Sequence, residues 1–311
     1  MNTFYVKIEK DVMMKNKKIF ILLTILFLGS ISLSAETNEE ASKYIINGNA
    51  YFNDGLFDKA IECYQKAVDI EPEDAEAYNN MGLAYDNMRN HDKAIECYQK
   101  VIKIDPDLAL PYNNMGIAYT NNGNYDKAIE YFQKAVDIEP DYAMAYYNMG
   151  IAYFYMENFD KAIECYQKAI EINPDFADAY YNMGIAYKHK ENYDKAIEYF
   201  QKAVDIDPDL AEAYYNMGIA YRHKENYDKA IECYQKVIEI DPEDADAYNN
   251  MGVAYCQKGM KISAADYLYK AGLLYLEQKS RQNVLRTIDA MKDLTPDSHL
   301  IQKLLDKLYE E

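Results

Sequence analysis

The sequence predicts an all-α solenoid of about seven helix hairpins, each 34 residues long, with capping helices at the C-terminal end. Three observations support this fold class. Each hairpin holds two stretches with apolar residues at helical spacing, and a proline such as Pro242 closes every repeat except the seventh. A fixed period of this length is typical of a repeat architecture rather than of a globular domain. The period itself is marked by glycines that stand 34 residues apart, at Gly48, Gly82, Gly116, Gly150, Gly184, Gly218 and Gly252.

The sixth repeat, residues 211–244, shows how one predicted hairpin is encoded. Residues 224–226 form the predicted turn, and Pro242 ends the second helix because it has no amide hydrogen to donate. We expect Gly218 and Ala230 to let the two helices approach closely. Intervals of three and four separate the apolar or small residues, which is the pattern of an amphipathic helix. These residues are Tyr214, Met217, Gly218 and Tyr221, then Ala230, Ile231, Tyr234, Val237 and Ile238.

The same repeat carries a resemblance to a known family. It is similar to the tetratricopeptide repeat in the identity and spacing of Tyr214, Met217, Gly218, Tyr221, Ala230, Tyr234, Val237 and Pro242. The resemblance implies a right-handed alpha-alpha superhelix, in which the first helices line a concave groove. In this family such a groove receives an extended peptide or a helix of a partner. With the N-terminal segment described below, the chain resembles a bacterial tetratricopeptide repeat protein that carries a signal segment.

The repeats divide most of the chain. The predicted solenoid covers residues 41–278, and residues 279–311 are expected to form a degenerate repeat and a C-terminal capping helix. In that helix Leu300, Leu304, Leu305 and Leu308 share one face, which would cover the end of the array. The predicted repeats are 41–74, 75–108, 109–142, 143–176, 177–210, 211–244 and 245–278.

Residues 1–35 have the order of a secretory signal. Three lysines, at positions 15, 17 and 18, precede an apolar run over 19–28, and small residues lead to Ala35. Cleavage near Ala35 would export the chain to the periplasm or outside the cell. The alternative is an uncleaved segment that anchors the chain in a membrane through residues 19–33. The start codon is open between Met1 and Met13 or Met14.

By the family resemblance, positions 2, 5, 6, 9, 12 and 13 of each repeat face the groove. An amide offers two donors and an acceptor, so a row of asparagines would suit the backbone of an extended peptide, although these residues are also common in idealised repeats of the family. The predicted groove residues are Asn80, Asn114, Asn148, Asn182, Asn216 and Asn250 at position 6, Tyr147, Tyr181 and Tyr215 at position 5, and Ile151, Ile185 and Ile219 at position 9.

Basic residues repeat at the end of two neighbouring first helices. Lys188 and His189 in the fifth repeat correspond to Arg222 and His223 in the sixth. These four residues are a candidate patch for an acidic ligand. The alternative is an ordinary solvated helix end, where cations favour the negative end of the helix dipole. Two histidines without a third ligand do not make a metal site.

Four of the five cysteines occupy one repeat position. Cys63, Cys97, Cys165 and Cys233 all stand at position 23, where the third and fifth repeats carry Tyr131 and Tyr199. Equivalent positions in neighbouring repeats are separated by a helix pair, about 10 Å or more. This distance exceeds the roughly 7 Å between α-carbons that a disulfide tolerates. The sequence therefore predicts no disulfide framework.

The charge and residue composition argue against two classes of function, nucleic-acid binding and catalysis. Acidic residues outnumber basic ones by 52 to 33, a net charge of -19, so nucleic acid is an improbable partner. Four histidines, no glycine-rich phosphate loop and no metal-ligand cluster argue against an enzyme, and no cofactor is expected. We therefore expect a non-catalytic scaffold that binds a protein or peptide partner. A self-associating structural array and an accessory subunit that presents substrates to a partner enzyme are the alternatives.

Overall fold

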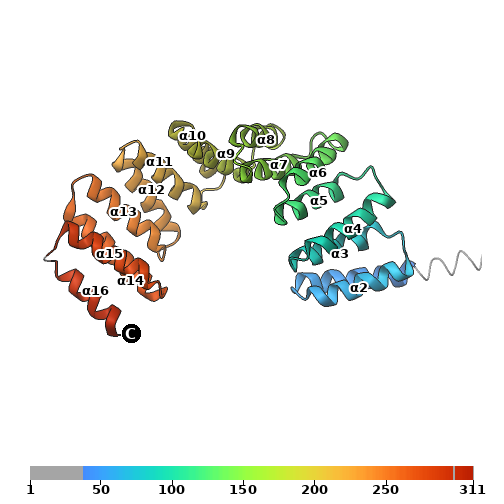
Figure 1. Ribbon diagram of the computed structural model, residues 1–311, viewed down its shortest axis with the longest axis horizontal. Coiled ribbons are helices and arrows are strands. Elements are labelled where there is room, and N and C mark those ends of the chain that lie inside the picture. Colours follow the sequence, from blue (N-terminus) through green and yellow to red (C-terminus); the bar gives the residue numbers. More distant parts are fainter. Residues whose placement is uncertain (1–37, 297, 311) are drawn as a thin grey trace, which may run out of the picture. The chain divides into compact units, whose positions relative to one another are not determined.

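The computed structural model describes residues 38–296 and 298–310, so the predicted signal and anchor segments lie outside the described residues. Throughout the described chain the regular structure is helical, and consecutive helices pair as hairpins (Figure 1), which confirms the predicted fold class. Contacts group the helices into two compact parts, an N-terminal part up to residue 138 and a C-terminal part from residue 139.

The N-terminal part holds the first three repeats. It begins with a helix over residues 38–53. The helices that follow pair in order, with each first helix packed against the second helix of its own repeat. They are α2 (Phe57–Ile70), α3 (Ala75–Asn87), α4 (His91–Ile104), α5 (Ala109–Asn121) and α6 (Tyr125–Ile138).

The C-terminal part continues the same arrangement and ends in three helices of different lengths. The first helices α7, α9 and α11 also contact one another in sequence, so they share one side of the stack. The helices are α7 (Ala143–Tyr155), α8 (Phe159–Ile172), α9 (Ala177–His189), α10 (Tyr193–Ile206), α11 (Ala211–His223), α12 (Tyr227–Ile240), α13 (Ala245–Gln257), α14 (Lys261–Glu277), α15 (Arg281–Leu294) and α16 (His299–Glu310).

All the hairpin turns of the seven repeats share a positive φ, and those with asparagine at position 16 also share a side-chain cap, which Leu56 and Met260 do not make in the first and seventh repeats. The residue at position 15 has a positive φ, which glycine adopts without steric cost. Gly55, Gly123 and Gly259 occupy this position in three repeats, whereas Glu225 holds a φ of 57° in the sixth. Where the next residue is asparagine, it caps the second helix, as when the Asn226 side chain accepts a hydrogen bond from the Lys229 amide at 3.3 Å.

The glycine at position 8 lies where the two helices of a hairpin meet. A Cβ atom on Gly218 would stand 2.6 Å from Cε1 of Tyr234, and one on Gly184 would stand 2.6 Å from the ring of Phe200. Both rings are fully buried. Only a residue without a side chain fits here, which confirms the close approach expected at Gly218.

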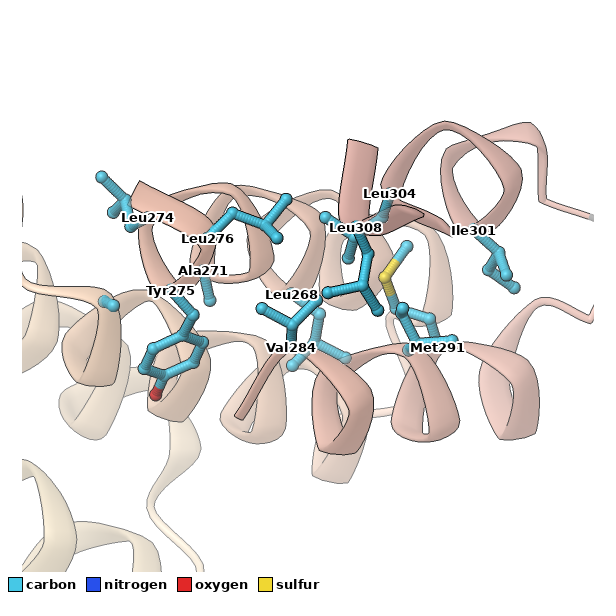
Figure 2. Packing of buried hydrophobic residues seen from close by; sticks show 12 residues of the cluster. Leu268, Ala271, Leu274, Tyr275, Leu276, Val284, Met291, Ile301, Leu304 and Leu308 are labelled. Atoms are coloured by element: carbon cyan, nitrogen blue, oxygen red, sulfur yellow. The ribbon is translucent and has the colours of Figure 1, made fainter. Parts of the chain in front are cut away.

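The C-terminal end is closed by its own apolar cluster. Figure 2 shows Ile301, Leu304 and Leu308 of α16 directed toward side chains of α14 and α15, and all three are buried. Gly272 of α14 faces Leu304 of α16, rather than a residue of α15 at the spacing used by the regular repeats. Residues 261–310 therefore close the stack with a packing pattern of their own. Of the helices described, none has the length and apolar character needed to cross a membrane.

Candidate functional site

The predicted groove asparagines form a ladder of hydrogen bonds between repeats. In the C-terminal part the Asn182 amide donates to the Tyr147 hydroxyl at 2.8 Å, spanning 35 residues. The same bond joins Asn216 to Tyr181 at 3.2 Å and Asn250 to Tyr215 at 2.7 Å. Each rung links position 6 of one repeat to position 5 of the repeat before it.

Two of these amides have no donor left for a ligand. The Asn216 amide nitrogen donates a second bond to the Glu212 carbonyl at 2.8 Å, and that of Asn250 donates to the Asp246 carbonyl at 3.0 Å. A primary amide has two N–H groups, so both are used. Sequence reasoning placed these residues on the groove but missed the ladder, whose signal is a tyrosine 35 residues before an asparagine.

In the N-terminal part the ladder uses asparagine at both ends of a rung. Asn114 donates to the Asn79 side-chain oxygen at 3.0 Å, again from position 6 to position 5, whereas Asn80 donates to that of Asn49 at 3.1 Å, which stands at position 9 of the first repeat. Asn148 lies half-buried on α7. The predicted isoleucines, Ile151, Ile185 and Ile219, are also half-buried on the first helices of their repeats.

The four candidate basic residues divide into two pairs. Lys188 donates to the Asn216 side-chain oxygen at 2.6 Å, and Arg222 donates to that of Asn250 at 3.2 Å, so both cations belong to the ladder. Burial lowers the pKa of the Lys188 ammonium. The two histidine rings instead lie against aromatic rings of the preceding repeat.

Both histidines make ring contacts in place of ion pairs. His189 stacks on Phe159 with centroids 5.2 Å apart, and His223 stacks on Tyr193 at 4.7 Å. Burial, followed by the charge of Lys188, lowers the pKa of His189. A lowered pKa disfavours the imidazolium, so His189 adds little positive charge at neutral pH.

Beside the last rungs of the ladder lies an acidic cavity of about 280 Å³. Burial is the main cause that raises the pKa of Asp244, and the charges of Asp246 and Asp241 add to it. Carboxylates held this close repel one another, which favours a bound cation. Tyr215 and Asn216 are predicted groove residues, and Glu212 and Asp246 stand at position 2, which the family resemblance also assigns to the groove, whereas Asp241 and Asp244 were not predicted there. The lining residues are Ala211, Glu212, Tyr215, Asn216, Asp241, Asp244 and Asp246.

The carboxylates of this acidic cavity do not form a metal site. Within residues 38–296 and 298–310, no group of three or more histidine, cysteine or acidic side chains is arranged to hold a metal ion. The cavity instead combines a tyrosine ring with several negative charges. Such a surface is suited to the ammonium or guanidinium group of a side chain, through charge and through a cation–π contact.

Models of tetratricopeptide repeats match consecutive segments of the chain. One model matches residues 107–175, 141–209, 175–243 and 209–271, a second matches 75–108, and a third matches 48–88. The chain belongs to the tetratricopeptide repeat family. Members of this family mediate protein–protein interaction and are in general not catalytic. The tetratricopeptide chain is therefore a protein-interaction scaffold by family.

Solved structures of other tetratricopeptide repeat proteins share the fold. A crystal structure of MamA is 34% identical and covers 53% of this chain and 97% of its own, with a TM-score of 0.50. MamA from Desulfovibrio magneticus RS-1 is 28% identical over 55% of this chain and 96% of its own, with a TM-score of 0.50. A tetratricopeptide repeat protein from Parabacteroides merdae, 19% identical, covers 87% of this chain and 99% of its own with a TM-score of 0.57. No curated protein matches the chain.

Proposed function

We propose that this tetratricopeptide chain is a non-catalytic scaffold that binds an extended peptide segment of a protein partner along the first helices, and that a lysine or arginine of the peptide enters the acidic cavity. The observation that carries the proposal is the cavity beside Tyr215 and Asn216, two residues of the predicted groove. Glu212 and Asp246 occupy position 2 of their repeats, which the family resemblance also assigns to the groove.

The asparagines of the ladder have a different role from the expected one, which was to bind the peptide backbone directly. Because the amides of Asn216 and Asn250 donate within the chain, they hold Tyr181 and Tyr215 in fixed orientations. The tyrosine rings and the carboxylates are then the groups that contact the peptide. A pre-oriented surface loses little side-chain entropy on binding, which favours affinity.

Charge selects the ligand. Two unit charges 4 Å apart attract by about 4 kcal/mol at the effective dielectric constant of a protein surface, about 20. The whole chain carries a net charge of -19, which also draws basic segments toward it. The acidic-ligand patch at Lys188, His189, Arg222 and His223 stays a prediction, since the cations are engaged with the ladder and the imidazoles with aromatic rings.

Peptide selection tests the proposal. A library of random twelve-residue peptides displayed on phage is selected against the full chain and against the double variant Glu212→Gln with Asp246→Asn. We expect lysine and arginine to be enriched in peptides bound by the native chain. The variant should bind the same peptides at least about tenfold more weakly, because two carboxylates of the cavity are lost.

The matched control is Glu164→Gln with Asp175→Asn, which makes the same chemical change on exposed residues outside the cavity. This control should bind as the native chain does, and raised salt should weaken native binding because the contacts are ionic. Enrichment of acidic or neutral peptides, or equal binding by both variants, would refute the role of the cavity. Concentration-dependent self-association without peptide binding would support the structural array instead.

For localisation we propose export, on the basis of the charged, apolar and small-residue order of residues 1–35. Expression of the full chain followed by cell fractionation and N-terminal sequencing tests this. A mature chain that begins near residue 36 outside the cytoplasm is the expected result. A full-length chain retained in the membrane fraction would support the anchor over residues 19–33.

A further inference from the structure

Three repeats insert a tyrosine of the second helix between two tyrosines of the first. In the fifth repeat the Tyr199 ring stacks on Tyr187, with centroids 5.3 Å apart and planes at 7°, and lies 6.4 Å from Tyr180. Tyr131 in the third repeat and Tyr267 in the seventh make the same pair of contacts. We call the space between the position 4 and position 11 rings the tyrosine slot.

In the sixth repeat the tyrosine slot is open. Position 23 is Cys233, as it is also cysteine in the first, second and fourth repeats, and in the sixth repeat a cavity of about 640 Å³ lies between α10, α11, α12 and α13. This volume falls within the range of ligand pockets, about 300 to 1,000 Å³. Its lining includes Tyr214 and Tyr221, which correspond to Tyr180 and Tyr187, together with Tyr255, Lys229, Lys236 and Cys233.

The lysine at position 26 differs between the fifth repeat, whose slot is filled, and the sixth, whose slot is open. Lys202 lies 4.8 Å from the centroid of the Tyr199 ring and pairs with Glu198 at 2.7 Å. Lys236 in the sixth repeat pairs instead with Glu239 at 2.7 Å, one turn further along α12. Because position 233 carries no ring, Lys236 does not make the ring contact that Lys202 makes with Tyr199. The slot of the sixth repeat therefore stays accessible.

The open slot offers an apolar shape and aromatic contacts, but no reactive group at neutral pH. Cys233 is 8% exposed, and burial raises the pKa of its thiol to about 12, so the reactive thiolate is scarce at neutral pH. Lys229 lies 5.2 Å from the centroid of the Tyr221 ring. None of the residues that line the slot belongs to the acidic cavity or to the predicted groove.

We propose that the open tyrosine slot of the sixth repeat is a second binding site, which receives the side chain of a tyrosine or phenylalanine from a protein partner. The chain itself shows which group fits, because a tyrosine ring fills the corresponding space in the third, fifth and seventh repeats. A ring seated there gains two aromatic contacts in addition to the burial of its apolar surface. This site would add an anchor independent of the acidic cavity.

The test uses N-acetyltyrosinamide as the probe and N-acetylleucinamide as the apolar control, titrated into the full chain by saturation-transfer NMR. We expect the leucine compound to bind at least about tenfold more weakly, since it lacks the ring contacts. The variant Cys233→Tyr fills the slot of the sixth repeat from within, as the tyrosine does in the third, fifth and seventh repeats, and should lower the saturation-transfer signal of the tyrosine compound at least about twofold.

A matched variant moves the site. Tyr199→Cys opens the slot of the fifth repeat, so it should increase the saturation-transfer signal, and in the Cys233→Tyr background it should return the signal to about the native level. Circular dichroism of each variant establishes that it is folded. An unchanged signal in Cys233→Tyr, equal binding of the leucine compound, or no binding to the native chain would overturn the proposal. If Cys233→Tyr does not fold, failure of Tyr199→Cys to increase the signal would overturn it as well.

Discussion

The fifth and sixth repeats share 25 of 34 residues, yet they differ in what they expose. The fifth carries Tyr199 and Phe200 at positions 23 and 24, and its slot is filled. The sixth carries Cys233 and Tyr234, and its slot is open. A filled slot and an open slot thus accompany the change at position 23. Three buried core positions differ as well, Phe200, Ala203 and Val204 in the fifth repeat against Tyr234, Val237 and Ile238 in the sixth.

A second difference lies at the end of the two repeats. The fifth ends in Leu210, which makes no side-chain cap for α11. The sixth ends in Asp244, whose carboxylate accepts a hydrogen bond from the Ala247 amide at 2.8 Å and lines the acidic cavity. Nearly identical repeats therefore acquire separate cavities through a few substituted positions, one of them, Cys233, within the packed interior.

The largest effect on stability is expected at position 8, where both repeats have a glycine, Gly184 and Gly218. Gly218→Ala should lower the free energy of unfolding by about 2 to 3 kcal/mol, because its Cβ would overlap the buried ring of Tyr234 and force it to move. Urea denaturation measures the change, with Glu225→Gly at the hairpin turn as a control that should not destabilise. An unchanged stability in Gly218→Ala would show that the two helices are not held at this separation.

A smaller loss of stability is expected at position 23, where the fifth and sixth repeats differ. Tyr199→Cys should destabilise the chain by about 2 kcal/mol, since it removes two ring contacts and the contact with Lys202. The same urea experiment measures this difference. A change below a few tenths of a kcal/mol would mean that the filled slot contributes nothing to the fold, and the contrast between the repeats would be one of surface only.

At position 24 the sixth repeat should gain stability. The Tyr234 hydroxyl is buried and has no hydrogen-bond partner among the described residues, whereas the fifth repeat has Phe200 there. Tyr234→Phe should therefore raise the free energy of unfolding by about 1 kcal/mol, because an unpaired buried hydroxyl is costly. A loss of stability would reveal a partner for this hydroxyl.

The smallest effect depends on pH. Burial and the nearby carboxylates raise the pKa of Asp244 above its ordinary value of 3.8. The folded chain then takes up this proton first as the pH falls, so the carboxylate destabilises the fold at pH 7 and ceases to do so below the unfolded-state pKa. Asp244→Asn keeps a capping oxygen and should gain less than about 1 kcal/mol at pH 7. Urea curves at pH 7 and pH 4 would contradict this if the native chain and the variant showed the same change.

Sequence reasoning predicted the hairpins because their determinants are local. The spacing of Tyr214, Gly218 and Tyr221 and the end of the helix before Pro242 are both determined within one repeat. The ladder was not predicted, because the partner of Asn250 lies 35 residues away and depends on how repeats stack. The open slot was also not predicted, because the cavity exists only where Cys233 replaces the ring that fills this space in other repeats. The acidic cavity requires charges from Glu212 and Asp246 of two repeats to meet.

The most direct test of this contrast exchanges positions 23 and 24 between the two repeats. The exchanged chain carries Tyr199→Cys with Phe200→Tyr and Cys233→Tyr with Tyr234→Phe, and its crystal structure is determined. The account predicts that the ring introduced at position 233 stacks between Tyr214 and Tyr221, and that a cavity opens between Tyr180 and Tyr187. A ring at position 233 that turns to solvent, or a fifth repeat that collapses without a cavity, would contradict the claim that these two positions open or close the slot.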